Sequence, residues 1–456
     1  MKDKSFAKKS TQNKSNETAI DQSIVVGLDI GTTKIACFVG VKNDHGKIEI
    51  ISMGKSKSIG VKQGVVFNIG ETIESIEKAI EDTQQNVEEG NLVLKHVVVG
   101  IAGQHIRSMQ NRGSFTRKDL SREISKKDIK EFVKDMYGLV MNPGEEIITV
   151  IPQEYNIDGL PGIKNPVGMG GSRMEANFHI ITGQVSNVKN IYSCVERAGL
   201  EIDDVILEPI ASADAVLNEE EKEAGIVLVD IGGGTTDVAI FHEGIIRHTA
   251  VIPYGGNVIT QDIRKGCKIL ERHAENLKVK FGSAVAKKSS ENEVVCIPGL
   301  KGQQPKEITL KTLAHIIESR MTEIIHLVKQ QIDNSGYADE IIGGIVVTGG
   351  GSKLKHLTQL FDHKTGMSSR IGYPCEHLAN ENNQNLMSPM YSTGIGLVLK
   401  GFEKGNPMRI VSKQEQEGEV EERGKFFSKV LDGVKNFFVD EEDVDEEGVD
   451  EKEDKE

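Results

Sequence analysis

Two short runs of the sequence place an aspartate, glycines and threonines directly after an apolar, strand-like segment. The first is Asp29-Ile30-Gly31-Thr32-Thr33, and the second runs from Asp230 to Asp237 as Asp-Ile-Gly-Gly-Gly-Thr-Thr-Asp. Glycine lets successive backbone N–H groups approach and point at phosphate oxygens. A carboxylate at the end of a buried strand can hold the waters of a Mg²⁺ ion, which prefers water plus one or two carboxylates. We therefore predict that Asp29 and Asp230 hold Mg²⁺ through water, beside phosphate groups bound by Gly31, Thr32, Thr33, Gly232, Gly233, Gly234, Thr235 and Thr236.

A third glycine-rich run follows the apolar segment 344–348 and consists of Gly349, Gly350, Gly351 and Ser352. A single glycine turn is weak evidence for a ligand site, but two matched Asp-Ile-Gly runs plus this third run are specific. Other signatures are absent: the sequence has no G-x-x-x-x-G-K-[ST], no dinucleotide-type G-x-G-x-x-G, no G-x-S-x-G and no H-E-x-x-H. Enzymes built on those motifs are therefore disfavoured.

The elements around these runs repeat along the chain. Strands are predicted at 24–28, 35–41, 48–53 and 92–101 in the first half, and at 225–229, 238–241, 245–251 and 344–348 in the second. Helices are predicted at 71–87, 188–198, 258–281 and 310–332. Each Asp-Ile-Gly run lies between two strands in its own half, which indicates a weak internal duplication and an α/β protein of two similar domains.

Composition sets further limits. A length of 456 residues suits two domains. The net charge of −14 gives no case for nucleic-acid binding, and most of the excess lies in the tail beyond residue 440. The five cysteines are dispersed, which favours reduced, buried thiols in a cytosolic protein over disulfides or zinc. Residues 1–22 are predicted to form a disordered extension without a secretory signal, and no apolar run reaches the roughly 18 residues of a spanning helix.

Taken in order, the three runs resemble the phosphate and adenosine loops of the superfamily of actin, heat-shock chaperones and sugar kinases. The resemblance implies the actin/heat-shock-chaperone two-domain ATPase fold, with a duplicated mixed-sheet core and ATP with Mg²⁺ as ligands. It makes 25–34 the first phosphate loop, Lys34 included, 227–237 the second, and 346–353 the adenosine loop. It makes 208–213 and 391–397 hinge helices, with Glu208 near the attacking water and Glu275 and Lys278 touching the nucleoside.

Within that superfamily the polar, turn-rich stretch 104–182 is discriminating. Its segments 99–106, 151–159 and 165–176 are similar to the FtsA cell-division family, which carries an inserted α+β subdomain at this place. The resemblance covers residues 24–400. It implies a first actin-like domain at 23–103 and 183–215, the insert at 104–182, and a second actin-like domain at 216–400 with a lobe at about 256–336.

The C-terminal segment 423–440 has apolar and aromatic residues at helical spacing within an arc of roughly 140°. These are Phe426, Phe427, Val430, Leu431, Val434, Phe437 and Phe438, and the opposite arc carries Lys425, Lys429 and Lys435. The pattern predicts an amphipathic helix lying in a membrane interface; a helix docked on the protein's own body or on a partner is the alternative. The segment follows a charged linker at 401–422 and precedes an acidic, disordered tail at 441–456.

The family resemblance implies a filament-forming cell-division protein with a mainly structural role. Such a protein ties the ring protein FtsZ to the cytoplasmic face of the inner membrane at the septum and recruits later division proteins. The lobe at 256–336 would receive the C-terminal peptide of FtsZ. Whether ATP is hydrolysed is left open. The alternatives are a small-molecule or sugar kinase, for which no substrate-pocket aspartate is found, and a pilus-assembly relative, which does not explain the C-terminal helix.

Overall fold

The computed structural model describes residues 23–43, 45–87, 93–119, 121–299, 301, 304–374, 378–379, 386–404 and 408–409. The predicted extension at 1–22, the linker beyond residue 409, the helix at 423–440 with all its membrane-facing residues, and the tail at 441–456 lie outside these residues. Among the helices that are described, none is both long and apolar enough to cross a bilayer.

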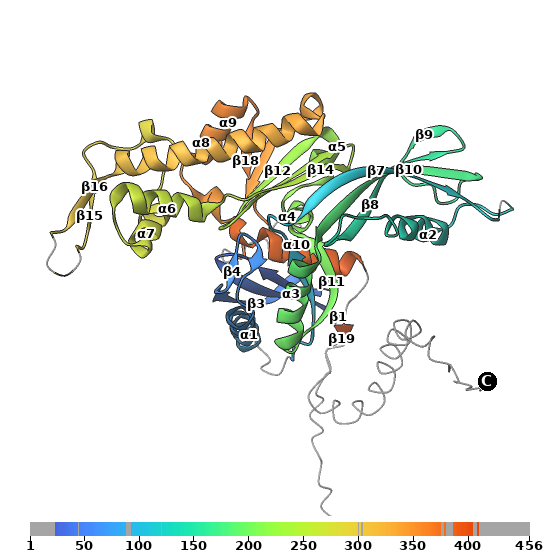
Figure 1. Cartoon of the computed structure of the whole chain (residues 1–456), viewed down its shortest axis with the longest axis horizontal. Coiled ribbons are helices and arrows are strands. Elements are labelled where there is room, and N and C mark those ends of the chain that lie inside the picture. Colours follow the sequence, from blue (N-terminus) through green and yellow to red (C-terminus); the bar gives the residue numbers. More distant parts are fainter. Residues whose placement is uncertain are drawn as a thin grey trace, which may run out of the picture.

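Two five-strand arrays with the same topology form the core of the molecule (Figure 1). In each array three antiparallel strands are followed by two strands that run parallel to the first of them. The first array has the order β3 (Ile48–Lys57), β2 (Lys34–Lys42), β1 (Ser23–Ile30), β6 (His96–Ile101), β11 (Glu201–Leu207), and β19 (Met408–Arg409) also pairs with β1. The second has the order β14 (Ile245–Ile252), β13 (Thr236–His242), β12 (Ile226–Ile231), β17 (Ile345–Thr348), β18 (Ser369–Ile371). The duplicated mixed-sheet core predicted from the sequence is confirmed.

The two aspartates occupy equivalent places in these arrays. Asp29 and Asp230 are the next-to-last residues of β1 and β12, the central strands, whose described side chains are buried. Each strand turns directly into its antiparallel partner, so each glycine run is a tight hairpin at the end of a buried strand.

Two helices cross between the arrays, α4 (Glu208–Val216) and α10 (Ser392–Glu403), at the positions predicted for the hinge helices. They approach so closely that a Cβ on Gly396 would overlap the carbonyl oxygen of Ala211. Ala211, Leu397 and the ring of Phe38 belong to one buried cluster that joins both sheets to these helices. Because α10 continues to Glu403, the first residues of the range predicted as linker are helical.

Outside the inserted stretch, α1 (Ile69–Gln85), α3 (Val185–Arg197), α5 (Glu219–Ala224), α8 (Leu310–Ser335) and α9 (Leu357–Thr365) pack on the sheets. The helices α6 (Gly256–Cys267) and α7 (Glu271–Phe281) pack on α8 and on each other. The single helix predicted at 258–281 is wrong. Lys268 takes a left-handed conformation (φ 52°) and its N–H closes the end of α6, so the chain breaks before α7. Glycine usually marks such a stop, and a lysine gives no comparable signal in the sequence.

Short hairpins complete the second domain's lobe and the first domain. They are β15 (Val294–Ile297) with β16 (Lys306–Thr309), and β4 (Val61–Lys62) with β5 (Val65–Val66).

Of the described cysteines, Cys37 and Cys194 are buried as predicted, and burial raises the pKa of the Cys37 thiol to about 12. Cys296 is exposed, contrary to the prediction, because β15 lies in a two-stranded hairpin with a solvent-facing side.

The inserted stretch folds as an α+β module, as predicted, with a four-stranded antiparallel sheet and one helix. Its elements are β7 (Arg107–Thr116), α2 (Lys126–Met136), β8 (Glu145–Ile157), β9 (Leu160–Ile163) and β10 (Arg173–Gln184), in the sheet order β7-β10-β8-β9. Phe132 and Phe178 pack edge to face in its own core. In Figure 1 the module projects on the side of the molecule opposite the lobe formed by α6, α7, β15 and β16.

The module also contacts the second domain, through edge strand β14. Ser108 Oγ donates to the carbonyl of Thr249 (2.7 Å), Gln110 Nε2 to that of Arg247 (3.0 Å), and Gln153 Nε2 to that of Ile246 (2.7 Å). Polar side chains of the insert therefore satisfy the backbone acceptors that an edge strand otherwise leaves open.

Candidate functional site

The two Asp-Ile-Gly runs face one another across a cavity of about 110 Å³ between the two arrays. Thirteen of the predicted site residues line it: Asp29, Gly31, Thr32, Thr33, Lys34, Glu208, Asp230, Gly232, Gly233, Gly234, Thr235, Gly349 and Gly350. The wall also contains Ile30, Gly64, Ala102, Asp237, Met390 and Thr393, which the sequence analysis did not single out. Segments about 200 residues apart in the chain are thus brought to one place.

Glycines in the second run allow this close approach. A Cβ on Gly234 would lie 2.5 Å from Thr32 Oγ1 and 2.9 Å from the Cα of Gln63, and a Cβ on Gly233 would overlap the side chain of Thr33. Real Cβ contacts are essentially never that short, so a larger residue would push the two domains apart. The structure therefore shows the two runs closed upon each other.

Asp230 ties the sheet of the second domain to both hinge helices. Its Oδ2 accepts hydrogen bonds from Ser212 Oγ on α4 (2.7 Å) and from Thr393 Oγ1 on α10 (3.3 Å). Burial is the main cause that raises the pKa of this carboxyl above its ordinary value. In the first domain, Asp29 is paired with Lys34 Nζ at 3.1 Å, and that ammonium also lies 5.2 Å from the centre of the Tyr391 ring.

Asp237 ends the second glycine run, but no role was predicted for its side chain. Its Oδ2 accepts from Thr235 Oγ1 (3.3 Å), while its buried Oδ1 has no hydrogen-bond partner. Burial and the neighbouring Asp230 raise its pKa well above the ordinary value. A signal was available, because Asp237 pairs directly with Asp230 across β12 and β13, and directly opposed residues share one face of a sheet.

Glu208, the first residue of α4, adds a fourth carboxylate to the cavity wall. Burial raises its pKa well above the ordinary value, and the charges of Asp29, Asp237 and Asp230 raise it further. Four carboxylates therefore face one lysine, Lys34, among the lining residues. Those of the four that are ionised would repel a phosphate group unless a cation came with it.

The donor set fits a Mg²⁺ ion bound with a phosphate. Among the described residues no three acidic, histidine or cysteine side chains lie close enough together to ligate a metal directly. Mg²⁺ does not need such a cage, because it keeps several waters and takes one or two carboxylates plus phosphate oxygens. Asp29 and Asp230 flank the cavity, and the orphaned Oδ1 of Asp237 provides a further acceptor.

Five predicted residues do not line the cavity. Thr236 donates its hydroxyl to the carbonyl of Tyr254, and Ser352 donates to that of Gly349. Gly351 packs against Ile231. Glu275 and Lys278 form an ion pair on α7 (2.7 Å), and Lys278 Nζ also donates to the Gly256 carbonyl (2.9 Å) beside the second run.

The cavity has room for phosphate-sized groups rather than for a nucleoside. Its volume is below the roughly 300–1,000 Å³ of ordinary small-molecule sites. The cavity therefore accounts for the phosphate groups alone, and a nucleoside must lie outside its volume.

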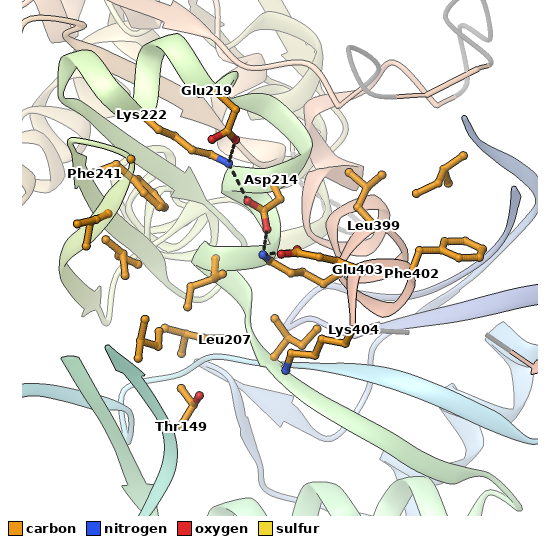
Figure 2. Close-up of a pocket in the computed structure, with 18 of the residues that line it drawn as sticks. Thr149, Leu207, Asp214, Glu219, Lys222, Phe241, Leu399, Phe402, Glu403 and Lys404 are labelled. Atoms are coloured by element: carbon orange, nitrogen blue, oxygen red, sulfur yellow. Dashed lines mark hydrogen bonds and ion pairs between the residues drawn. The ribbon is translucent and has the colours of Figure 1, made fainter. Parts of the chain in front are cut away.

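A second cavity, of about 830 Å³, lies along the C-terminal halves of the hinge helices (Figure 2). Asp214 lies between Lys222 (3.0 Å) and Lys400 (2.7 Å), and the apolar wall includes Leu207 and Phe402. The residues that line it include none of the three glycine runs. We therefore place the phosphate chemistry in the smaller cavity.

The raised pKa of Glu208 predicts how the stability of the nucleotide-free protein depends on pH. In the unfolded chain a glutamate ionises near pH 4.3, whereas in the folded protein Glu208 keeps its proton to higher pH. The folded state then binds more protons, so this residue lowers the free energy of unfolding as pH rises between the two pKa values. Glu208→Gln should therefore be more stable than the wild type at pH 8, by a margin that shrinks toward pH 4.5. Urea unfolding with a chelator measures this; Glu77→Gln, on the exposed face of α1, is the control. A difference in the free energy of unfolding that stays the same at all pH values would contradict the prediction.

Comparison with known families gives two matches. Residues 227–396 match the family model described as cell division protein FtsA, and residues 103–182 match the model described as the SHS2 domain inserted in FtsA. The cell division protein FtsA of Pseudomonas aeruginosa is 40% identical over 381 residues, which cover 84% of this chain and 90% of that protein. That of Neisseria meningitidis is 35% identical over 422 residues, covering 91% and 99%.

Solved structures share the fold at low sequence identity. The PilM–PilN type IV pilus biogenesis complex aligns with a TM-score of 0.60 at 14% identity, over 83% of this chain and 98% of that chain. MreB5 of Spiroplasma citri bound to ADP aligns with a TM-score of 0.50 at 16% identity, over 84% and 96%. These likenesses establish the actin-like architecture.

Proposed function

The chain belongs to the FtsA family of cell division proteins, and from this premise we propose that it binds ATP with Mg²⁺ between its two actin-like domains. One observation carries the proposal: two matched Asp-Ile-Gly hairpins close on a single buried cavity whose carboxylates outnumber its one lysine. That charge balance suits a phosphate only together with a divalent cation. A protein of the same architecture, MreB5 of Spiroplasma citri, was solved bound to ADP.

We assign roles within the site as follows. Asp29 and Asp230 hold the waters of Mg²⁺, which neutralises phosphate charge, and Lys34 with the N–H groups of the first two glycine runs binds phosphate oxygens. Glu208 orients the water near the terminal phosphate. The nucleoside contacts are Glu275, Lys278, Gly349, Gly350, Gly351 and Ser352. The bound nucleotide serves mainly to keep the domains closed for assembly.

We further propose the partners that go with a structural role. The lobe at about 256–336, built from α6, α7, β15, β16 and α8, receives the C-terminal peptide of FtsZ. Copies of the chain form filaments, and the segment 423–440 binds inner-membrane lipid on the cytoplasmic side, at the septum, where later division proteins are recruited. The domain limits that go with this proposal are 23–103 with 183–215, 104–182 and 216–400.

The two alternative functions, a small-molecule or sugar kinase and a pilus-assembly protein, now have less support. A kinase would share the nucleotide cleft, and a pilus-assembly relative shares the fold, but the sequence match to FtsA proteins spans most of the chain. The match to the inserted SHS2 domain at 103–182 supports the same family.

Membrane attachment is expected to depend on both the C-terminal segment and the nucleotide. Purified protein should sediment with anionic liposomes, and more strongly with Mg²⁺ and ATP, because linking many helices through a polymer multiplies affinity. Phe437→Glu should weaken binding about tenfold or more, since a buried aromatic side chain contributes about 1.5–3 kcal/mol. Val140→Glu is the control, because Val140 is 96% exposed on the inserted module. Unchanged sedimentation of the Phe437 variant would remove the proposed anchor.

A further inference from the structure

We propose that the hairpin at residues 61–66 is a clasp that holds the cleft shut at its phosphate end and slows nucleotide release. This inference rests on the proposed ATP site. The hairpin consists of β4, the turn Gln63–Gly64 and β5, and it precedes helix α1 in the first domain. No motif of the sequence points to this hairpin.

Gln63 makes the contact that crosses the cleft. Its Nε2 donates to the carbonyl of Pro253 at 2.9 Å. Pro253 lies between β14 and α6 of the second domain, two residues before Gly255. A Cβ on Gly255 would lie 2.6 Å from the carbonyl oxygen of Gly232 in the second glycine run. Opening the cleft at this point must break the bond between Gln63 and Pro253.

The turn is fixed on the first-domain side by two hydrogen bonds that its own backbone makes. Gly64 N–H donates to Thr32 Oγ1 (3.2 Å), and Gln104 N–H donates to the Gln63 carbonyl (3.4 Å). A Cβ on Gly64 would lie 2.5 Å from the Cα of Gly103 and 2.7 Å from the carbonyl oxygen of Ala102. Only glycine fits at this turn position, which also has a positive φ of 72°.

The second domain packs against the other side of the same turn. A Cβ on Gly234 would lie 2.9 Å from the Cα and 3.0 Å from the N of Gln63. Gln63 itself has a φ of 49°, which is uncommon for a residue other than glycine. With Gly64 it forms the two-residue turn, positive φ at both positions, that is typical of tight hairpins. The turn is therefore wedged between Ala102–Gly103 of one domain and Gly234 of the other.

The hairpin also orients a phosphate donor. Because Thr32 Oγ1 accepts the Gly64 N–H, the hydroxyl proton of Thr32 is left to point elsewhere. Thr32 lines the phosphate cavity, so that proton can be donated to an anionic oxygen there. A bound phosphate would thus contact Thr32 of the first domain and Gly234 of the second. The Gln63–Gly64 turn contacts the same two residues.

The test is the rate at which a fluorescent ATP analogue, N-methylanthraniloyl-ATP with Mg²⁺, leaves the full-length protein in stopped flow. Gln63→Ala removes one neutral hydrogen bond and should speed release about three- to tenfold. Gln63→Glu keeps the length of the side chain but has no donor for Pro253, so it should release equally fast. A role in packing alone would leave the Glu variant at the wild-type rate. Gln104→Ala is the matched control, because Gln104 is exposed next to the same turn.

The outcomes separate the clasp from the site beneath it. Wild-type binding of the analogue, its loss in Asp230→Ala and wild-type release from both Gln63 variants would overturn the clasp alone. No binding by the wild type would overturn the nucleotide site and the clasp together. Urea midpoints within experimental error of the wild type show that the variants are folded.

Discussion

Replacing Asp230 with alanine should abolish Mg²⁺-dependent ATP binding, with a loss of affinity of about 100-fold or more, and leave the fold intact. Asp230 is the acceptor through which Ser212 and Thr393 connect both hinge helices to the second glycine run. It is also one of the two carboxylates assigned to the waters of Mg²⁺. Removal of a group that orients a metal or its ligands typically costs 10–100-fold in affinity, and here the aspartate has both tasks.

The fold should tolerate this change for a physical reason. Burial raises the pKa of Asp230, so its ionised form is unfavourable in the folded protein without a cation. Ser212 Oγ and Thr393 Oγ1 lie 3.0 Å apart and can bond to each other when the carboxylate is gone. We therefore expect the urea midpoint of Asp230→Ala to equal or exceed that of the nucleotide-free wild type.

Isothermal titration with MgATP measures the loss of affinity. The variant Asp230→Asn separates the effect of the charge from that of the hydrogen bonds. Asparagine keeps an acceptor for Ser212 and Thr393 but has no charge, so it should also lose the Mg²⁺ dependence of binding. Full MgATP affinity in either variant would contradict the assignment of the site.

Replacing Gly396 with alanine should produce the largest loss of stability, about 3 kcal/mol or more. The added Cβ would overlap the carbonyl oxygen of Ala211, so the hinge helices must move apart. Overpacking in a rigid core typically costs about 1–3 kcal/mol and occasionally more, and here the obstacle is backbone rather than a side chain that can turn away. ATP affinity should fall as well, since Ser212 and Thr393 on these two helices bind Asp230.

Urea unfolding provides the measurement for this variant. Gly170→Ala is the control, because no atom lies within 4 Å of the Cβ position of Gly170 and its φ is not in the left-handed region. That variant should remain within about 0.5 kcal/mol of the wild type. A Gly396→Ala protein as stable as the wild type would show that the two helices can separate freely.

The sequence predicted the architecture because the informative residues are local. Asp29 and Asp230 each stand where an apolar strand meets a glycine turn, and this local chemistry specifies both the strand and the hairpin that follows it. The inserted module was likewise predicted from a continuous stretch of the chain, and the two hinge helices from the resemblance to the actin superfamily.

The direction of side chains could not be read as easily. Thr236 and Asp237 are neighbours in β13, so they point to opposite faces of the sheet. Asp237 lines the cavity, and Thr236 therefore donates to Tyr254 inside the second domain. Thr236 was predicted by residue type, whereas the register of β12 and β13 favours Asp237.

The hairpin at 61–66 escaped the sequence analysis for a different reason. Its strands have two residues each, and Gln63 gains its significance from Pro253, which lies 190 positions away in the chain. No local pattern encodes such a contact. The end of helix α6 at Lys268 was also missed, since lysine seldom adopts the left-handed conformation found there.

The contacts of Ser108, Gln110 and Gln153 with β14 have a consequence for aggregation. Three carbonyls along that edge already accept side-chain donors from the same molecule. A neighbouring molecule cannot lay a strand there without first displacing the inserted module. Continuous intermolecular β-sheets are therefore disfavoured along β14.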